Sequence, residues 1–326
     1  MTVLDSPAVL VTGGAGFIGS HVVAALRAAG RRVVVLDDMS AGRRANLAGL
    51  VGDPRVVLVE GDVRGELGAL LDRHGPFAAV VHMAAQTSVV RSVEAPLADL
   101  DLNLRATVGL ALWAADAGVR QFAFASSAAV YGDAARLPVA EEDEAAPLSP
   151  YGAAKRGAEL YLRALGELRG MATASLRLFN VYGPRQDPAS AYAGVVAAFL
   201  GRALRGEPLL VFGDGAQTRD LVYVEDVARA FVLAVGTGRT GHVLCNIATG
   251  RETSVLSLAA AAQAAARACG GRPGEVVRAA ARAGEISRSR AAVERAAAVL
   301  GFRAETELAD GLRRTAEALA AELGGG

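Results

Sequence analysis

The chain has 326 residues, 52% of them hydrophobic, and its 34 basic residues balance 34 acidic ones. This length allows one large domain or two unequal ones, and zero net charge with scattered arginines gives no basic patch for nucleic acid. Two cysteines do not make a disulfide framework, four histidines without ligand spacing predict no metal site, and no apolar stretch approaches the length of a membrane span. The first residues show no signal peptide, so we expect a cytoplasmic protein.

The first half of the chain alternates short strands with helices. Apolar and β-branched runs predict six strands, at Ala8–Thr12, Arg32–Leu36, Val56–Glu60, Ala79–Met83, Gln121–Ser126 and Thr173–Leu178. Amphipathic or alanine-rich segments predict the helices between them, near Phe17–Ala29, Glu66–His74, Pro96–Ala117 and Pro150–Leu168. Strands that are apolar throughout and separated by helices are typical of a parallel sheet covered on both faces. We therefore predict an α/β fold built on a doubly wound parallel sheet.

The pattern becomes less regular after about residue 180. Short strands are predicted at Leu209–Phe212 and His242–Ala248, and helices near Val195–Arg205, Val255–Cys269 and Glu305–Leu323. We interpret residues 1–178 as a nucleotide-binding domain of Rossmann type, to which residues 217–250 return. Residues 179–326 are then mainly a smaller, mixed α/β domain.

A glycine-rich turn joins the first strand to the first helix. In Thr12–Gly19, three glycines spaced by three residues permit a tight turn, close approach of a pyrophosphate and close helix–strand packing. The N-terminus of the helix adds backbone N–H donors for the diphosphate. Asp37 ends the second strand, where its carboxylate can accept from both ribose hydroxyls and would repel a 2′-phosphate, and Asp38 strengthens this preference. The turn therefore predicts a site for NAD rather than NADP, with Asp62 placed to meet the adenine amino group.

Lys155 is the only lysine among the 34 basic residues, and it follows Tyr151 by four positions. This spacing places both side chains on one face of a helix that Pro150 is suited to begin. A tyrosine with a pKa of about 10 becomes a base near neutrality only with roughly 4 kcal/mol of stabilisation, at about 1.36 kcal/mol per unit. A lysine cation and a positive nicotinamide ring in a dry cleft can supply it. Ser127, which ends the fifth strand, can orient a hydroxyl proton, although a core tyrosine and a plain strand-end serine are the alternatives.

With these residues, the chain resembles the extended short-chain dehydrogenase/reductase superfamily, and within it the UDP-glucose (UDP-galactose) 4-epimerase group. The resemblance covers Thr12–Gly19, Asp37, Asp62–Val63, His82–Gln86, Asn103, Ser126–Gly132, Tyr151–Lys155, Arg177–Gln186 and Arg219–Asp226. It implies that NAD is held by Gly13, Gly16, Phe17, Ile18, Gly19, Asp37, Asp38, Asp62, Val63, Ala84, Ala85, Gln86, Asn103, Tyr151 and Lys155. It also implies Ser127, rather than Ser126, as the partner of Tyr151 and Lys155. Tyr151 is then the base and acid, and Lys155 also binds the nicotinamide ribose.

The reaction that the resemblance implies is oxidation of a sugar C4 hydroxyl to a ketone by hydride transfer to NAD. The keto-sugar then turns over in the site and takes the hydride back on its other face. Members that dehydrate sugars carry an Asp-Glu pair directly after the triad Ser/Thr, where this chain has Ala128 and Ala129. Members that epimerise C3 and C5 or make fucose place a cysteine in this turn, which this chain lacks. Both differences favour epimerisation at one carbon.

The resemblance further implies a UDP-sugar as the substrate, with UDP-glucose and UDP-galactose first. Its expected contacts, besides Ser127 and Tyr151, are Thr87 and Ser88 near the sugar, and Asn180, Arg185, Arg219 and Arg282 at the diphosphate or near the pocket. Ala283 replaces the family proline beside Arg282, which loosens that alignment. Ser289 falls where a bulky gate excludes N-acetylated sugars in some epimerases, so UDP-GlcNAc or UDP-GalNAc stays open. A UDP-sugar with a uronic acid, such as UDP-glucuronate, also stays open as a substrate, because arginines such as Arg185 lie near the predicted pocket.

Two other functions stay open from the sequence. One is an NAD-dependent reductase of a nucleotide-linked keto-sugar that exchanges its cofactor in each turnover. The other is a redox-sensing binding protein on the same fold, although a sensor needs no catalytic base. The family commonly dimerises through helices that correspond to Pro96–Ala117 and Pro150–Leu168, so we expect a homodimer, with neither nucleic acid nor a membrane as a partner.

Overall fold

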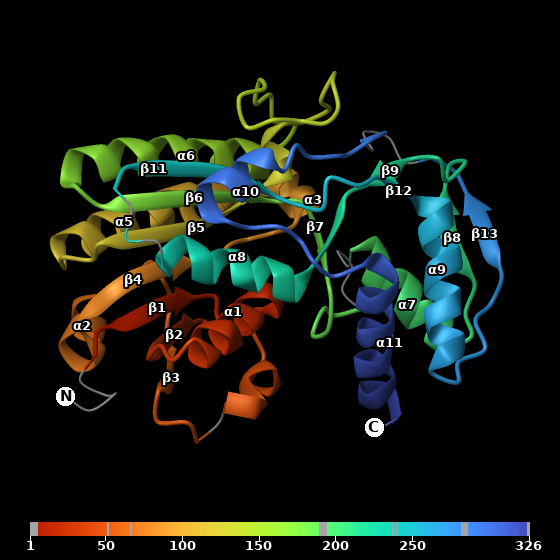
Figure 1. Cartoon of the computed structure of the whole chain (residues 1–326), viewed down its shortest axis with the longest axis horizontal. Coiled ribbons are helices and arrows are strands. Elements are labelled where there is room, and N and C mark those ends of the chain that lie inside the picture. The colour runs from red at the N-terminus through yellow and green to blue at the C-terminus, as the bar shows by residue number, and fades with distance from the viewer. Residues whose placement is uncertain are drawn as a thin grey trace.

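Seven parallel strands form the central sheet of the protein, in the order β11–β6–β5–β4–β1–β2–β3 (Figure 1). The computed structural model describes residues 6–50, 52–65, 67–188, 194–236, 238, 240–281 and 286–324. The strands are β1 (Ala8–Thr12), β2 (Val33–Asp37), β3 (Val56–Glu60), β4 (Phe77–His82), β5 (Gln121–Ser127), β6 (Ala172–Leu178) and β11 (His242–Ile247). The predicted doubly wound parallel sheet is therefore confirmed. The strand order reverses between β1 and β4, and such a switch point opens a crevice at the carboxyl ends of the strands.

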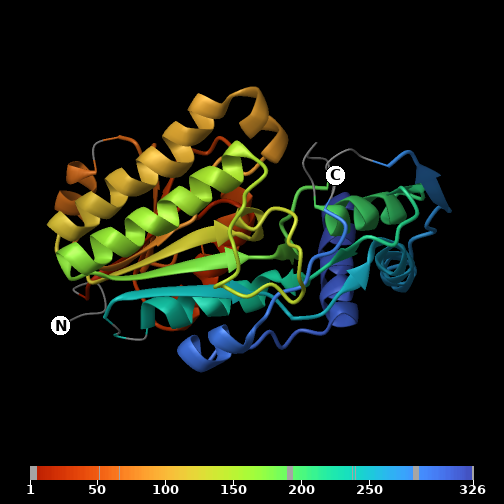
Figure 2. The ribbon, with the colours of Figure 1, turned by 90° about the horizontal axis from the view of Figure 1, so that it is seen from above.

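Helices cover both faces of this sheet, because successive strand residues point to opposite sides. Val9 and Val11 pack with α1 (Phe17–Ala28), α8 (Val224–Gly236) and α10 (Glu294–Leu300), whereas Ala8 and Leu10 pack with the helices of the other face. Those are α2 (Gly68–His74), α5 (Ala106–Asp116) and α6 (Pro150–Arg169). Figure 2 shows α5 and α6 side by side above the sheet, with α8 and α10 below it.

The helix predicted over Pro96–Ala117 is divided. The structure has α4 (Pro96–Leu100), then a π-helical turn (Asp101–Arg105), and only then α5. A π-helical turn widens the backbone by one residue and is frequent at functional sites. Shorter helical elements are α3 (Val89–Glu94) and 3₁₀ turns at Arg44–Leu50 and Ala128–Val130.

The segment after residue 217 returns to the sheet. β11 pairs with β6 at the sheet edge, and α8, which the sequence did not predict, packs against α1. This arrangement supports our proposal that residues 1–178 and 217–250 form one domain.

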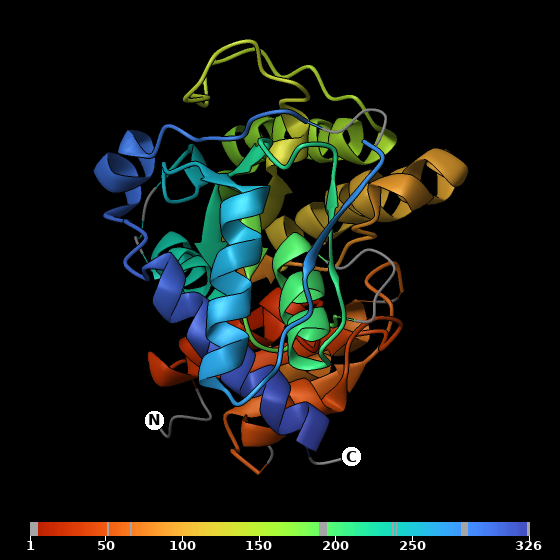
Figure 3. The same ribbon diagram turned by 90° about the vertical axis from the view of Figure 1, so that its right-hand side faces the viewer.

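The remaining elements gather beside the carboxyl ends of the sheet strands. Helices α7 (Val195–Leu204), α9 (Val255–Ala268) and α11 (Leu308–Gly324) share one apolar core there, and Figure 3 shows them on the side that faces the viewer. Three strand pairs complete this part: β7 (Asn180–Tyr182) with β10 (Leu221–Tyr223), β8 (Leu209–Phe212) with β13 (Val276–Ala279), and β9 (Thr218–Arg219) with β12 (Thr253–Ser254). None of the described helices combines the length and the apolar character needed to cross a bilayer.

Candidate active site

A cavity of about 830 Å³ opens at the carboxyl ends of the strands, where the strand order reverses. This volume is within the range of small-molecule and cofactor sites. Most residues that the sequence assigned to cofactor or substrate line it: Gly13, Gly16, Phe17, Ile18, Gly19, Asp37, Asp38, Asp62, Val63, Ala84, Ala85, Thr87, Ser127, Tyr151, Lys155, Asn180 and Arg185. The fold thus brings together residues that are up to 172 positions apart, from 13 to 185.

The glycine turn at one end of the cavity has no room for side chains. Gly13 has a φ of +67°, and a Cβ there would lie 2.7 Å from the backbone nitrogen of Ala84. A Cβ on Gly19 would overlap the carbonyl oxygen of Gly13. The turn therefore requires glycine at both positions, and it leaves the N-terminus of α1 bare toward the cavity, as a diphosphate requires.

Asp37 lies buried at the end of β2 and faces the same cavity. Its Oδ2 accepts from Ala15 N at 2.9 Å, and its Oδ1 accepts from Met39 N at 2.9 Å. Each carboxylate oxygen has two acceptor sites, so both can still receive a ribose hydroxyl. Asp62 differs, because its carboxylate forms an exposed ion pair with Arg64 that lowers its pKa.

Tyr151 and Lys155 lie on consecutive turns of α6, whose first turn is fixed by Pro150 and by Ser149, which accepts from Gly152 N. Both residues are buried, and Lys155 is only 2% exposed. Lys155 Nζ donates to Ala125 O at 2.9 Å and lies 5.8 Å from the centroid of the Tyr151 ring. The predicted shared helix face is therefore confirmed.

Burial has the largest effect on the pKa of both Tyr151 and Lys155. It lowers the pKa of Lys155 to about 8, against the opposing charges of Asp99 and Glu159. It also raises the pKa of Tyr151, with Asp99 acting in the same direction and a hydrogen bond with Ser127 opposing. In the protein without bound ligands, burial keeps the pKa of the Tyr151 phenol above its ordinary value.

Two neighbouring serines at the end of β5 have different partners. Ser126 Oγ donates to Glu159 Oε1 at 2.6 Å, on the buried side of the strand. Ser127 Oγ accepts from Ala129 N at 3.1 Å and is the hydroxyl that interacts with Tyr151. This difference supports Ser127, rather than Ser126, as the partner of the phenol.

Comparison with known proteins identifies the family of the chain. The sequence profile of the NAD dependent epimerase/dehydratase family matches residues 9–248. The chain belongs to this family. A UDP-glucose 4-epimerase of Mycolicibacterium smegmatis is 42% identical over 310 residues, which cover 94% of this chain and 97% of the relative. The UDP-glucose 4-epimerase of Thermotoga maritima, solved with UDP-glucose, is 37% identical with a TM-score of 0.89 over 97% of this chain and 99% of that one.

A UDP-N-acetylglucosamine 4-epimerase of Methanobrevibacter ruminantium, in complex with UDP-N-acetylmuramic acid, is 31% identical with a TM-score of 0.88. The match covers 97% of this chain and 99% of that one. The resemblance to extended short-chain dehydrogenases/reductases is thus confirmed, the protein is an enzyme of the epimerase type, and NAD is its cofactor. The bare glycine turn and the buried Asp37 fit this cofactor.

Several residues that the resemblance implied for this family member do not line the cavity. Gln86 and Asn103 form hydrogen bonds with each other, and Ser88 Oγ accepts from Arg91 N as the cap of α3. Arg219 Nη1 donates to the carbonyls of Thr218 and Ile286 instead of facing the cavity. Arg282, Ala283 and the motif around them lie outside the described residues.

Sequence reasoning missed a buried polar network behind the site. Glu159 and Arg177 form an ion pair in which both side chains are 1% exposed. The signal was present: Glu159 follows Lys155 by four residues, so it lies on the same buried helix face. Asp99 is also buried and lies four residues before Asn103, within the divided helix. Both carboxylates affect the pKa of Lys155.

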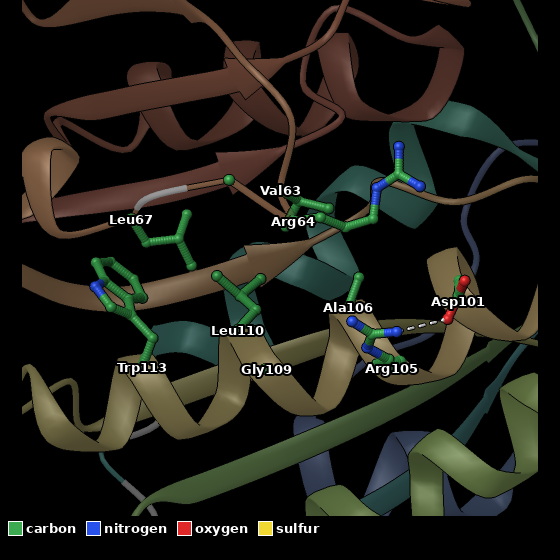
Figure 4. Close-up of a pocket in the computed structure, with 10 residues that line it drawn as sticks. Val63, Arg64, Leu67, Asp101, Arg105, Ala106, Gly109, Leu110 and Trp113 are labelled. Atoms are coloured by element: carbon green, nitrogen blue, oxygen red, sulfur yellow. Dashed lines mark hydrogen bonds and ion pairs between the residues drawn. The ribbon is translucent and has the colours of Figure 1, made fainter.

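A second cavity, of about 530 Å³, adjoins the first at Val63 (Figure 4). Leu67, Leu110 and Trp113 line one end of it, and the exposed Asp101–Arg105 ion pair borders the other. The apolar end carries no group for acid–base chemistry. The residues that the sequence assigned to catalysis, Ser127, Tyr151 and Lys155, line the first cavity.

Proposed function

We propose that the protein is an NAD-dependent epimerase that inverts C4 of a UDP-sugar through a transient 4-keto sugar, with UDP-glucose and UDP-galactose as its substrates. The observation that carries this proposal is the placement of Ser127, Tyr151 and Lys155 in the cavity that the glycine turn and Asp37 also line. The relatives named UDP-glucose 4-epimerase support the choice of sugar.

The side chains divide the work as follows. Tyr151 takes the proton from the C4 hydroxyl and later returns it, while Ser127 orients that hydroxyl. Lys155 stabilises the phenolate and holds a ribose hydroxyl. Bound NAD⁺ supplies the hydride acceptor and a positive ring near the phenol. Burial of Tyr151 and Lys155 excludes water and strengthens the attraction between their charges.

The turn after β5 limits the chemistry to redox at the carbinol carbon. Ala128 and Ala129 begin a 3₁₀ turn directly after Ser127. Their methyl groups cannot move protons at C5 or C6 of the sugar. This supports epimerisation over dehydration.

UDP-GlcNAc is the second candidate substrate. Ser289 is small, and one structural neighbour is named as a UDP-N-acetylglucosamine 4-epimerase. UDP-glucuronate has weaker support, because the guanidinium of Arg185 donates to Ser20 Oγ, on α1, at 3.1 Å. Incubation with UDP-glucose, UDP-GlcNAc, UDP-glucuronate and dTDP-glucose, with resolution of the C4 epimers, tests these alternatives. We expect UDP-glucose to turn over; a panel without any C4 epimer refutes the proposal.

Cofactor retention separates the epimerase from a keto-sugar reductase. An epimerase regenerates its cofactor in each cycle, so we expect NAD to stay bound through desalting. A reductase would lose it and need added NADH. Reduction of bound NAD by UDP-galactose in a single turnover excludes a redox sensor.

We also propose that the enzyme is a homodimer through α4, α5 and α6. Leu97 on α4 is 76% exposed and Leu168 on α6 is 79% exposed. Leu160 and Tyr161 are more than half exposed on the same helix. Exposed apolar side chains gathered on neighbouring helices are typical of a subunit interface.

A further inference from the structure

A buried carboxylate that the proposed reaction does not use lies near the helix that carries Tyr151 and Lys155. Asp99, on α4, is 1% exposed. Its Oδ1 accepts from Gln86 Nε2 at 2.9 Å and from Asn103 Nδ2 at 2.8 Å. Its Oδ2 is buried and has no hydrogen-bond partner among the described residues. Such an oxygen is unusual and calls for a physical explanation.

The hydrogen bonds around Asp99 fix the orientation of its carboxylate. Asn103, in the π-helical turn, accepts from Gln86 N at 3.0 Å and donates to Gln86 O at 2.9 Å. Gln86 Nε2 is shared between Asp99 Oδ1 and Ser88 O. The side-chain amides of Gln86 and Asn103 therefore both donate to Oδ1 of Asp99, and no described residue donates to its Oδ2.

We propose that Asp99 is a positioning residue whose free carboxylate oxygen supplies the counter-charge that keeps Lys155 an ammonium. This proposal rests on the proposed function, in which Lys155 must be charged to stabilise the phenolate. Helices α4 and α6 pack against each other, and among the described residues the buried ammonium donates a single hydrogen bond, to Ala125 O. A buried cation with one neutral acceptor needs a nearby negative charge.

The other ionisable groups that face Lys155 do not provide a free charge. Glu159, on its own helix, is tied to Arg177 of β6 and to Arg156. His82, on β4, is neutral, because burial and then the charge of Lys155 lower its pKa to about 3. Asp99 is thus the carboxylate near Lys155 that no described arginine neutralises.

The charge of Asp99 shifts the pKa of Lys155 and the pKa of Tyr151 in the same direction. It raises the pKa of Lys155, against burial, and it adds to the burial that raises the pKa of Tyr151. Burial raises the pKa of Asp99 itself, while Gln86, Asn103 and then Lys155 oppose this rise. Loss of the charge should therefore lower the pKa of Lys155 and of Tyr151 together. Both limbs of a pH–activity profile then move to lower pH.

Asp99→Asn isolates this charge. The asparagine oxygen keeps both hydrogen bonds at the Oδ1 position, and only the free Oδ2 becomes an amide nitrogen. Because the chain has one lysine, protein grown with ¹³Cε-lysine gives a single resonance whose shift reports the ionisation of Lys155. We expect its titration midpoint to fall by about one unit, and the kcat profile to move the same way.

Asp101→Asn is the matched control, since that side chain is 47% exposed and pairs with Arg105. It should leave both readouts unchanged. A folded Asp99→Asn variant with an unmoved Lys155 midpoint overturns the proposal. If the variant does not fold, the wild-type titration decides: a midpoint above neutrality supports the proposal, and one below it overturns it. The titration needs no sugar nucleotide, so absence of turnover would refute the proposed function alone.

Discussion

Replacing Glu159 by glutamine should destabilise the protein strongly, because it leaves the guanidinium of Arg177 buried without a counter-charge. The carboxylate accepts from Arg177 Nε at 2.9 Å and from Arg177 Nη2 at 2.7 Å. It also accepts from Ser126 Oγ at 2.6 Å. Despite the opposing effect of burial, Arg177 holds the pKa of Glu159 below its usual value. The carboxylate is therefore ionised at neutral pH.

The magnitude follows from burial. Removing one partner of a buried ion pair costs about 3–5 kcal/mol, since the remaining charge stays desolvated. Glutamine has nearly the volume of glutamate, so no cavity adds to this. Arg177 keeps its bond to Glu141 O at 3.3 Å and its position over the Tyr131 ring, 4.6 Å from the centroid. These contacts favour the lower end of the range.

Urea unfolding followed by circular dichroism measures this loss. Glu167→Gln is the control, because Glu167 lies on the same helix and pairs with Arg163 at 3.5 Å with both side chains more than 60% exposed. It should change the free energy of unfolding by less than about 0.5 kcal/mol. If Glu159→Gln loses less than about 1 kcal/mol, the buried pair is not what holds α6 to β6.

Three further predictions follow from the structure. Lys155→Arg should keep the charge but lose most of kcat, because the guanidinium is larger and placed differently, and near-normal turnover would contradict this. Burial lowers the pKa of His82 to about 3 and that of His21 to about 4, so below about pH 6.5 the unfolded chain binds protons that the folded chain does not. The urea concentration at the midpoint of unfolding should therefore fall as the pH drops below about 6.5. A midpoint that does not change with pH would contradict this. Glutamate at Leu97 and Leu168 should give a monomer in light scattering, whereas unchanged dimers would place the interface elsewhere.

The strands could be predicted because their physical cause is local. Val33–Asp37 and Gln121–Ser127 are apolar runs between turn residues, and such runs form buried parallel strands whatever their neighbours. The glycine turn was equally readable, since its glycines are required by backbone geometry within a few residues. The segment Tyr151–Lys155 was readable because helical spacing alone sets which side chains share a face.

The missed features depend on distant partners. A glutamate at 159 is buried only because Arg177 reaches it from β6. Glu141, the first residue of an acidic run at 141–144, is buried and accepts from Asn246 N at 2.7 Å. The π-helical turn at Asp101–Arg105 shifts the backbone by one residue, which hydrophobic periodicity does not reveal. Helix α8 is buried by contacts with α1 and with strands β4, β5 and β6, all of which lie far from it in the sequence.

The most direct test of the proposed function approaches one equilibrium from both sides. Purified protein without added cofactor is incubated with UDP-glucose or with UDP-galactose, and the C4 epimers are followed by proton NMR. Both reactions should reach the same mixture, with no net formation of NADH, and Tyr151→Phe should abolish the conversion. If neither sugar is converted, or if the product has lost water, the account of Ser127, Tyr151 and Lys155 as an epimerase site is contradicted.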